Sequence, residues 1–451
     1  MQITETSSEG LKRTLQVVVP AGEISKRFDE RLDDLKDRVQ LKGFRKGKVP
    51  TPHLKKMYGR SVMVEVLQET VRDTSSQALA DRKMRPAMQP DVSFPEDDAE
   101  MERVLAGQAD LSYSMSFEVL PPIPLANFED LKLEKFVAEV DDEAVQKGID
   151  DLVERSVSHT AEEGRAAQTG DRVTLDFVGK IDGEAFEGGT AEDAPIVLGQ
   201  GNFIPGFEEG LTGVKAGDEK DIAATFPDDY PVESLKGKAA TFSIKVKEVA
   251  APVRPAVDEE FAKTLGATDL NQLKEFLRER IGREYAGASR QKLKRDLLDQ
   301  LEKVHSFELP PSLVEAEFNG IWKQLEESLK RAGKTFADEG KTEEEAREEY
   351  RKLAERRVRL GLVIGEIADK NDLKITQDEM RRALMEQARR FPGQEKAVYE
   401  YFEKTPGALA ELRAPIFEDK VVDFVIDKAK PVERKVSRDE LFKKLEEADE
   451  A

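Results

Sequence analysis

The N-terminal quarter of the chain mixes alternating and helical patterns of hydrophobic positions. Apolar side chains at every second position over 11–19, after a shorter run at 2–6, predict a β-hairpin closed by a Ser-Ser-Glu-Gly turn. From 24 to 39, apolar residues recur every three or four positions, which predicts an amphipathic helix. Alternation over 111–119 predicts a half-buried strand. Strands flanking helices indicate a small α+β domain.

A basic loop follows the first helix, and the pattern then becomes helical again. Thr51 and Pro52 are typical of an N-cap and a first helical residue. Tyr58 and Gly59 are expected to end this short helix, and another helix is expected from about 62 to 80. The loop is therefore expected between helices, at a tip of the domain.

The segment after this domain has the composition of a connection. Its first residues, 121–128, are Pro-rich and mark a boundary. Residues 129–140 can form a strand, and Asp141 can cap a following helix. We expect 121–169 to be an extended linker that packs against another part of the chain.

The remaining two regions differ in pattern. Residues 170–250 contain short strand-like runs separated by Gly and Asp turns. Residues 251–451 are helical, with predicted helices at 269–304, 310–331, 342–370, 376–391, 406–430 and 437–448. Several of these helices carry more apolar residues than one buried stripe needs. These residues either pack helix against helix or line an open surface for unfolded chains, and both alternatives stay open. Trp322 is expected in the core.

Composition limits the class of protein. A length of 451 residues with 39% hydrophobic and 36% charged residues predicts two to four folded domains. The chain has no cysteine and three scattered histidines, so neither disulfides nor a metal centre are expected. A secretory leader and a membrane-length apolar run are both absent from the sequence. We therefore expect a cytoplasmic protein that binds no membrane and needs no cofactor.

One short segment of this acidic chain is strongly basic. The chain has a formal net charge of −21, yet residues 36–60 contain nine Lys or Arg and one acid, a local charge of +8. Such a basic window predicts that the protein binds an anionic partner through one localised contact. A nucleic-acid-binding module is one alternative. The acidic remainder of the chain and the lack of interleaved aromatic residues argue against it.

The centre of this window is the sequence GFRKGKVP at 43–50. Its two glycines allow sharp backbone turns. Phe44 has no apolar neighbour before Val49, which favours an outward-pointing ring, and the alternative is a solvated basic turn with Phe44 packed back into the core. The whole string resembles the ribosome-binding signature of the trigger factor family of bacterial chaperones. The resemblance implies seven ribosome-binding residues: Gly43, Phe44, Arg45, Lys46, Gly47, Lys48 and Pro50.

A second resemblance covers nearly all of 170–250. The stretches VTLDFVGKIDGEAFEGG and VLGQGNFIPGFEEGL resemble the FKBP-type peptidyl-prolyl isomerase family. The resemblance implies a pocket around the substrate proline formed by Phe177, Phe186, Glu187, Phe203, Ile204, Phe207, Tyr230 and Ile244. Phe207, Glu187 and Ile244 depart from the Trp, Asp and Phe that are common in the family, and these departures bear on drug affinity rather than on the fold.

These residue types suit the chemistry of prolyl isomerisation. Rotation about an X–Pro bond must leave amide resonance, a barrier of about 18–20 kcal/mol. An apolar aromatic pocket disfavours the charge-separated planar amide and needs no nucleophile. Hydrogen bonds from Tyr230 and a backbone N–H could hold the substrate carbonyl. The alternative is that the aromatic residues only form the core of a small barrel.

Two short motifs are not interpreted as nucleotide sites. Gly199-Gln200-Gly201 would need a third glycine where Ile204 stands, and no strand–turn–helix unit surrounds it. Gly340-Lys341-Thr342 would need a glycine where Thr335 stands.

The three regions occur in the order found in trigger factors. The resemblance implies a multidomain α+β protein with a ribosome-binding domain at 1–120, the linker at 121–169, an FKBP-like β-rich isomerase domain at 170–250 and an all-helical chaperone domain with arms at 251–451. It implies an ATP-independent chaperone that docks on the large ribosomal subunit near the exit tunnel, shields nascent and unfolded polypeptides, and forms a homodimer when free. The alternative function is a free FKBP-type isomerase whose flanking domains only recruit substrates.

Overall fold

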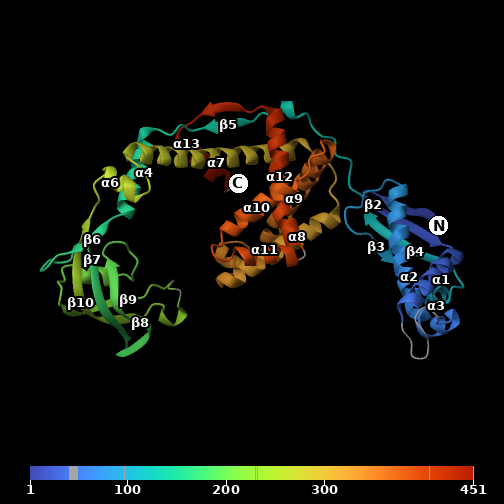
Figure 1. The fold of residues 1–451 in the computed structure, drawn as a ribbon, viewed down its shortest axis with the longest axis horizontal. Coiled ribbons are helices and arrows are strands. Elements are labelled where there is room, and N and C mark those ends of the chain that lie inside the picture. Colours follow the sequence, from blue (N-terminus) through green and yellow to red (C-terminus); the bar gives the residue numbers. More distant parts are fainter. Residues whose placement is uncertain (40–48, 96, 229, 231, 406, 450–451) are drawn as a thin grey trace. The chain divides into compact units, whose positions relative to one another are not determined.

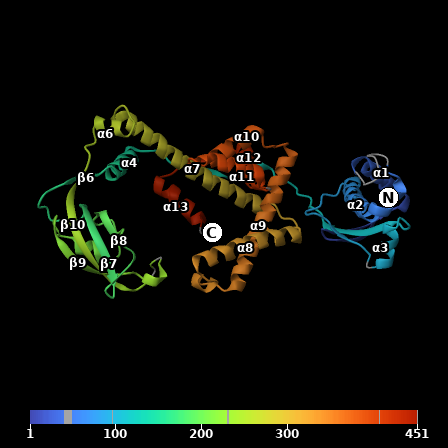
Figure 2. The ribbon, with the colours of Figure 1, turned by 60° about the horizontal axis from the view of Figure 1, so that its bottom comes forward.

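A computed structural model describes residues 1–39, 49–95, 97–228, 230, 232–405 and 407–449. The chain forms two compact units, Met1–Lys135 with Lys292–Val432, and Phe136–Gln291 with Glu433–Ala451. Figures 1 and 2 show the helices and strands of each unit. None of the helices in the described ranges is long and apolar enough to cross a membrane.

A four-stranded antiparallel sheet opens the first unit, in the order β1-β2-β4-β3. Its strands are β1 (Gln2–Glu9), β2 (Lys12–Val19), β3 (Asp91–Ser93) and β4 (Leu111–Glu118). The alternation predicted for the last strand is confirmed, because its buried residues are Leu111, Tyr113, Met115 and Phe117. The hairpin turn is tighter than expected: β1 continues to Glu9, and Gly10 takes the left-handed conformation at φ +53°.

Three helices accompany this sheet: α1 (Ala21–Arg38), α2 (Thr51–Asp81) and α3 (Asp98–Leu105). The amphipathic pattern of α1 is confirmed by its buried residues Ile24, Phe28 and Leu32. The short strand β3 and the helix α3 were not predicted, because neither is long enough to show a period.

The break predicted at Tyr58 and Gly59 is wrong, since α2 is one continuous helix of 31 residues. Glycine inside a helix costs roughly 1 kcal/mol relative to alanine, which the buried residues that follow can outweigh. The glycine also lies against α1, where a Cβ would come 3.8 Å from the ring of Phe28. The sequence predicted Thr51 as the N-cap of α2, but the N-cap is Pro50.

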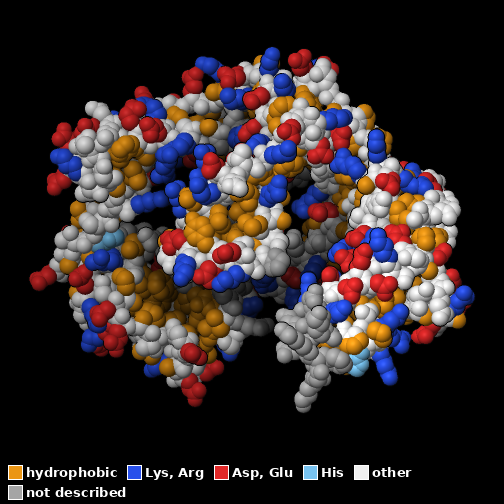
Figure 3. Space-filling view, turned by 45° about the vertical axis from the view of Figure 1, so that its right-hand side comes forward, with side chains coloured by type: hydrophobic (Ala, Val, Ile, Leu, Met, Phe, Trp, Pro, Cys, Tyr) orange, Lys and Arg blue, Asp and Glu red, His pale blue; other side chains and the backbone are white. Residues whose placement is uncertain are grey.

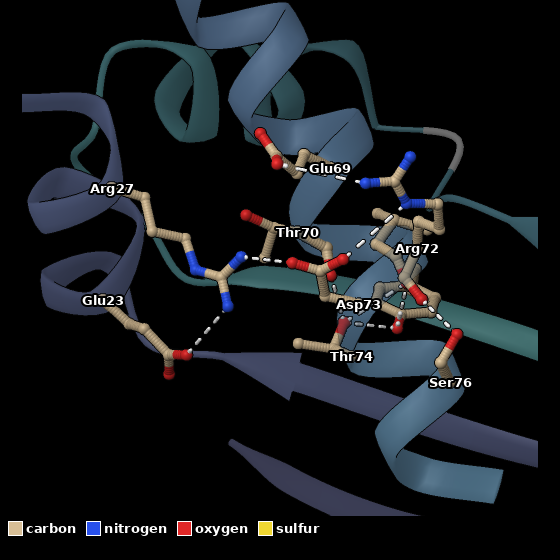
Figure 4. Close-up of polar contacts among 10 residues, drawn as sticks. Glu23, Arg27, Glu69, Thr70, Arg72, Asp73, Thr74 and Ser76 are labelled. Carbon is tan, nitrogen blue, oxygen red and sulfur yellow. Dashed lines mark hydrogen bonds and ion pairs between the residues drawn. The ribbon is translucent and has the colours of Figure 1, made fainter. Parts of the chain in front are cut away.

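Polar contacts tie α2 to its neighbours (Figure 4). Arg27 on α1 donates a hydrogen bond of 3.0 Å to Asp73 on α2. Thr74 is buried, and its hydroxyl lies 2.8 Å from the phenol oxygen of Tyr113 on β4. These contacts fix α2 across the sheet, so that the last part of the basic window, residues 51–60, belongs to a rigid helix.

The rest of the first unit is helical. Its elements are the C-terminal part of α7 (Leu270–Val304), then α8 (Pro311–Ala332), α9 (Glu343–Lys370), α10 (Gln377–Arg389), α11 (Glu395–Lys404) and α12 (Ala408–Ala429). The prediction that the linker packs on another part of the chain is confirmed, because Ile123, Leu131 and Leu133 lie in one core with residues of α7, α9 and α12. Helix α11 was not predicted: its ten residues lie between two Pro-Gly breaks that mask a short period.

Trp322 lies in the core, as expected. Its ring stacks 5.8 Å from Phe318 and 5.2 Å from Phe336, measured between ring centroids. The guanidinium of Arg347 lies 4.3 Å from the centre of the indole. These contacts join α8 to α9 through aromatic and cation–π packing.

The second unit begins with short elements around the N-terminal part of α7. They are β5 (Glu134–Val137), α4 (Asp142–Arg155), α6 (Glu259–Thr264), β11 (Val432–Lys435) and α13 (Arg438–Asp449). The predicted cap is confirmed, because the Asp141 side chain accepts a hydrogen bond of 2.8 Å from the backbone N–H of Ala144. Val145 and Ile149 then pack against Leu277 of α7. Single-turn 3-10 helices elsewhere in the chain are Phe128–Asp130, Glu233–Leu235 and Phe336–Glu339.

A five-stranded antiparallel sheet completes the second unit. Its strands are β6 (Ser158–Ala161), β7 (Arg172–Ile181), β8 (Glu184–Val197), β9 (Glu219–Thr225) and β10 (Ala239–Val253). They follow the path β6-β10-β7-β8, with β9 on β10, and the short helix α5 (Phe207–Leu211) lies between β8 and β9 in the sequence. The core on this sheet consists of Val173, Leu175, Phe207, Leu211, Phe242 and their neighbours.

Candidate functional site

Seven aromatic rings in the second unit form one connected cluster. They are Phe177, Phe186, Phe203, Phe207, Phe226, Tyr230 and Phe242. Phe207, at the start of α5, is buried, and its centroid lies 5.0 Å from Phe242 on β10 and 5.8 Å from Phe177 on β7. Most of these pairs meet edge to face, which is the favourable arrangement for aromatic rings.

The structure brings most of the predicted pocket residues together. The rings at 177, 186, 203, 207 and 230 belong to the connected cluster, and Ile204 and Ile244 pack on the same core. Ile244 also faces Phe177 across the β10–β7 pair. Glu187 is different, since it is exposed on β8 beside Phe186. Phe203 is 38% exposed and therefore lies at the rim of the cluster.

Two rings of the cluster were missed from the sequence. Phe242 contacts three other rings and lies on the same face of β10 as Ile244, so the alternation of that strand could have identified it. Phe226 follows β9 and lies 4.7 Å from Tyr230 and 5.7 Å from Phe186. It joins Tyr230 to the rest of the cluster.

Two glycines make room for the ring of Phe186. A Cβ on Gly179 would lie 2.7 Å from ring atoms of both Phe186 and Phe242, and a Cβ on Gly189 would lie 2.7 Å from Phe186. A Cβ atom essentially never comes within 3.0 Å of a non-bonded atom. Both positions therefore need glycine for space, which explains why the motif is rich in this residue.

The carboxylate of Asp176, which precedes Phe177 on β7, is held as an ion. Lys247 on β10 lies 2.6 Å from Asp176 and 2.7 Å from Asp193. The hydrogen bond from Lys247, together with one of 2.8 Å from the backbone N–H of Asp193, lowers the pKa of Asp176. This carboxyl group is therefore a charged structural link and is not poised to donate a proton.

The cluster is suited to binding an apolar ring and excluding water. It offers edges and faces of aromatic side chains, while the carboxylate of Asp176 is neutralised by an ion pair with Lys247. Removing water from the amide disfavours its charge-separated planar form relative to the twisted form, which lowers the barrier to rotation. Each ~1.4 kcal/mol gained increases the rate about tenfold. Within the described residues, no three His, Cys, Asp or Glu side chains are grouped as metal ligands.

The basic window is only partly described. Gly43, Phe44, Arg45, Lys46, Gly47 and Lys48 lie outside the described residues. After them, Val49 is fully buried and Pro50 is exposed at the start of α2. Lys55 on α2 lies 5.3 Å from the centre of the Phe28 ring.

Three family models match the chain. Residues 1–152 match the bacterial trigger factor protein, residues 163–247 match FKBP-type peptidyl-prolyl cis-trans isomerase, and residues 269–427 match the bacterial trigger factor protein C-terminus. Together these models cover most of both units.

Full-length relatives agree with these matches. The chain is 51% identical over 447 residues to the trigger factor of Azorhizobium caulinodans, covering 99% of both proteins. It is 52% identical over 452 residues to the trigger factor of Afipia carboxidovorans, covering 100% of both. A solved structure described as "Promiscuous Substrate Recognition in Folding and Assembly Activities of the Trigger Factor Chaperone" shares the fold, with a TM-score of 0.57 and 22% identity over 95% of this chain and 100% of that one.

The fold is thus a three-domain one, with a mixed α/β N-terminal domain, an FKBP-like domain and a helical C-terminal domain. Such a chain is a molecular chaperone with peptidyl-prolyl isomerase activity. It belongs to the bacterial trigger factor family.

Proposed function

We propose that this protein is a cytoplasmic, ATP-independent chaperone that docks on the large ribosomal subunit near the exit tunnel and shields nascent chains there. Residues 1–120 bind the ribosome, 121–169 are the linker, 170–250 isomerise X–Pro bonds, and 251–451 hold unfolded polypeptides. Away from the ribosome the protein forms a homodimer. No membrane takes part.

The aromatic cluster supports a proline pocket formed by the eight residues from Phe177 to Ile244 named above. The supporting observation is the stacking of Phe203 on Phe207, with centroids 5.5 Å apart, because the outer ring is exposed and the inner one is buried. An exposed ring on a rigid aromatic base offers a flat apolar wall to a substrate. Glu187 stands at the edge of this proposed pocket.

Exposed apolar side chains support the holding of unfolded chains by the helical region. On the mutually packed helices α10, α11 and α12, Met385, Tyr401 and Leu409 are each more than 40% exposed, and so is Phe391 between α10 and α11. Figure 3 shows hydrophobic side chains gathered in patches among charged ones on the viewed surface. Covering exposed apolar groups with an unfolded segment removes them from water and lowers the free energy.

The basic window supports docking on an anionic ribosome surface, with Gly43 to Lys48 and Pro50 as the contact. We test this by cosedimentation with ribosomes. Replacing Phe44, Arg45 and Lys46 together by Ala should abolish binding of the full chain, and binding of the unchanged protein should weaken as salt rises. A matched control replaces Arg72, Lys83 and Phe94 by Ala, three exposed residues of the same domain.

The control variant should bind ribosomes as the unchanged protein does. Undiminished binding of the variant at 44–46 would contradict the docking proposal and favour the alternative, a free prolyl isomerase with substrate-recruiting domains.

A further inference from the structure

Four backbone N–H groups converge on one carboxylate beside the aromatic cluster. Glu208 Oε2 accepts hydrogen bonds from Gly199 at 2.8 Å and Gly201 at 3.3 Å. Its Oε1 accepts from Asn202 at 3.0 Å and Phe203 at 3.3 Å. One half-buried side chain thus binds almost every amide of a five-residue loop.

The loop has the conformation of an anion-binding nest. Gly199 and Gly201 have φ values of +90° and +68°, which glycine adopts without strain. Alternation of such residues turns successive N–H groups toward one point, where they attract a negative charge. The Gly-Gln-Gly sequence that falls short of a nucleotide motif therefore does form an anion site, and the anion is a carboxylate of the same chain.

This loop carries the outer wall of the proposed proline pocket. Phe203 is its last residue, and the ring stacks on Phe207, whose position is fixed because it is buried in the core. Ile204, the next residue, packs on the same core. The backbone on which both side chains stand is thus held by the carboxylate that follows Phe207 in the sequence.

We propose that Glu208 is a positioning residue of the isomerase site. Its carboxylate acts as a built-in anion that orders residues 199–203 and so holds Phe203 against Phe207, ready to receive a substrate. The inference rests on the proposed function, because it assumes that Phe203 contacts the substrate.

Glu209 is the natural control. It stands on the same helix, is exposed, and accepts a single hydrogen bond of 2.7 Å, from the N–H of Gly206. It caps α5 without touching the loop, so a general effect of losing a carboxylate from this helix would appear in Glu209→Gln as well.

The first measurement is hydrogen exchange in the full-length protein. Glu208→Gln leaves one acceptor oxygen for four N–H groups and turns an amide donor toward them. Peptides covering 198–204 should exchange faster, while peptides from β10, and peptides covering 198–204 in Glu209→Gln, should exchange as in the unchanged protein. Unchanged exchange at 198–204 overturns the inference and leaves the pocket itself intact.

The second measurement is a double-mutant cycle on isomerisation of a prolyl peptide. Glu208→Gln should lower kcat/KM about tenfold, mainly through a higher KM, because bonds to a charged acceptor are lost. Phe203→Ala should have a similar effect, and the double variant should be no worse than Phe203→Ala alone. Additive losses would mean that Glu208 acts elsewhere, which overturns the inference. If Phe203→Ala alone isomerises normally, the proposed pocket is what fails.

The third measurement asks whether an external anion can replace the side chain. Glu208→Ala empties the nest, so acetate should restore part of the lost activity, and chloride at equal ionic strength should not. A purely structural loss would not respond to acetate. Absence of rescue, together with unchanged exchange at 198–204, rejects the proposal.

Discussion

Arg165 and Asp171 form a two-pronged ion pair at the base of the five-stranded sheet. The guanidinium Nε lies 2.8 Å from one carboxylate oxygen and a terminal nitrogen lies 3.1 Å from the other. Burial alone would raise the pKa of Asp171, but hydrogen bonds from Arg165 and from the N–H of Gln168 outweigh it and lower this pKa. The pair fixes the segment that leads into β7.

Asp171→Asn should therefore destabilise the isomerase region. The side chain is 1% exposed and loses a charged acceptor, so the free energy of unfolding should fall by about 2 kcal/mol. Denaturant unfolding monitored by prolyl isomerase activity measures this change. The control is Glu154→Gln, which removes the exposed pair with Arg254 and should cost less than about 0.5 kcal/mol. Equal effects of the two variants would mean that burial does not strengthen the pair.

Stability of the helical region should depend on pH through Glu379. The N–H of Thr376, followed by Lys420, lowers the pKa of this carboxylate from 4.5 to about 2. Because the folded pKa is depressed, the stabilisation is complete above about pH 4.5 and is lost as the pH falls toward 2. Melting temperatures of the unchanged protein and of Glu379→Gln should differ at pH 6 and converge near pH 2.

Glu386→Gln is the control for this pH dependence, since Glu386 is exposed on the same helix. It should leave the profile unchanged. A Glu379→Gln profile parallel to that of the unchanged protein down to pH 2 would show that the link from α10 to α12 carries no pH-dependent stability.

Gly179→Ala should damage the aromatic cluster although it adds one methyl group. The new Cβ would lie 2.7 Å from two rings, and overpacking of this kind typically costs about 1–3 kcal/mol. Both thermal stability and isomerase activity should fall. Gly287→Ala is the opposite case, because this glycine lies inside α7 with open space around it, and alanine there should stabilise the helix by up to about 1 kcal/mol. A neutral Gly179→Ala would show that the rings can move.

The pairing of β6 with β10 indicates the boundaries of a stable isomerase fragment. Its residues 158–161 pair with 250–253 of β10, and Ala167 exchanges backbone hydrogen bonds of 2.8 Å with Val214 and Gly213. A fragment of residues 158–253 should therefore be more stable to urea than one of residues 170–250, and should isomerise short prolyl peptides. Equal urea midpoints for the two fragments would show that β6 adds nothing.

The complementary deletion separates the two activities. A variant lacking 158–253, closed by a short flexible linker, should lose isomerase activity and still suppress aggregation of a proline-free unfolded client, as measured by light scattering. The apolar side chains exposed on α10 to α12 remain in this variant. If the variant is folded by circular dichroism but prevents no aggregation, the helices are not the holding surface.

The sequence predicted those features that depend on neighbours in the chain. Alternation located β2 and β4, and the pattern of Ile24, Phe28 and Leu32 located α1. The break expected at Gly59 was wrong because the local cost of glycine is small beside the packing of the buried residues along one long helix. A single-sequence pattern cannot measure that packing in advance.

In the candidate site, too, the sequence predicted what lies within short motifs and missed contacts that only the fold creates. All five predicted pocket rings meet in one cluster, and four of them, Phe177, Phe186, Phe203 and Phe207, stand in the two sequence stretches that resemble the isomerase family. The carboxylate of Glu208 could not be paired with Gly199 from the sequence, since only the folded loop turns four N–H groups toward it. Phe226 was missed for a similar reason: its neighbours Tyr230 and Phe186 are brought to it by the fold.

The stack around Trp322 makes the protein easy to follow by its own fluorescence. Trp322 is the single tryptophan of the chain, and its indole stacks with Phe318 and Phe336 in the first unit. Excitation at the red edge of protein absorption therefore reports on α8 and α9 and not on the aromatic cluster of the second unit. Thermal unfolding followed by tryptophan emission reports on the first unit, and thermal unfolding followed by loss of prolyl isomerase activity reports on the second. The two units of one molecule can therefore be monitored independently.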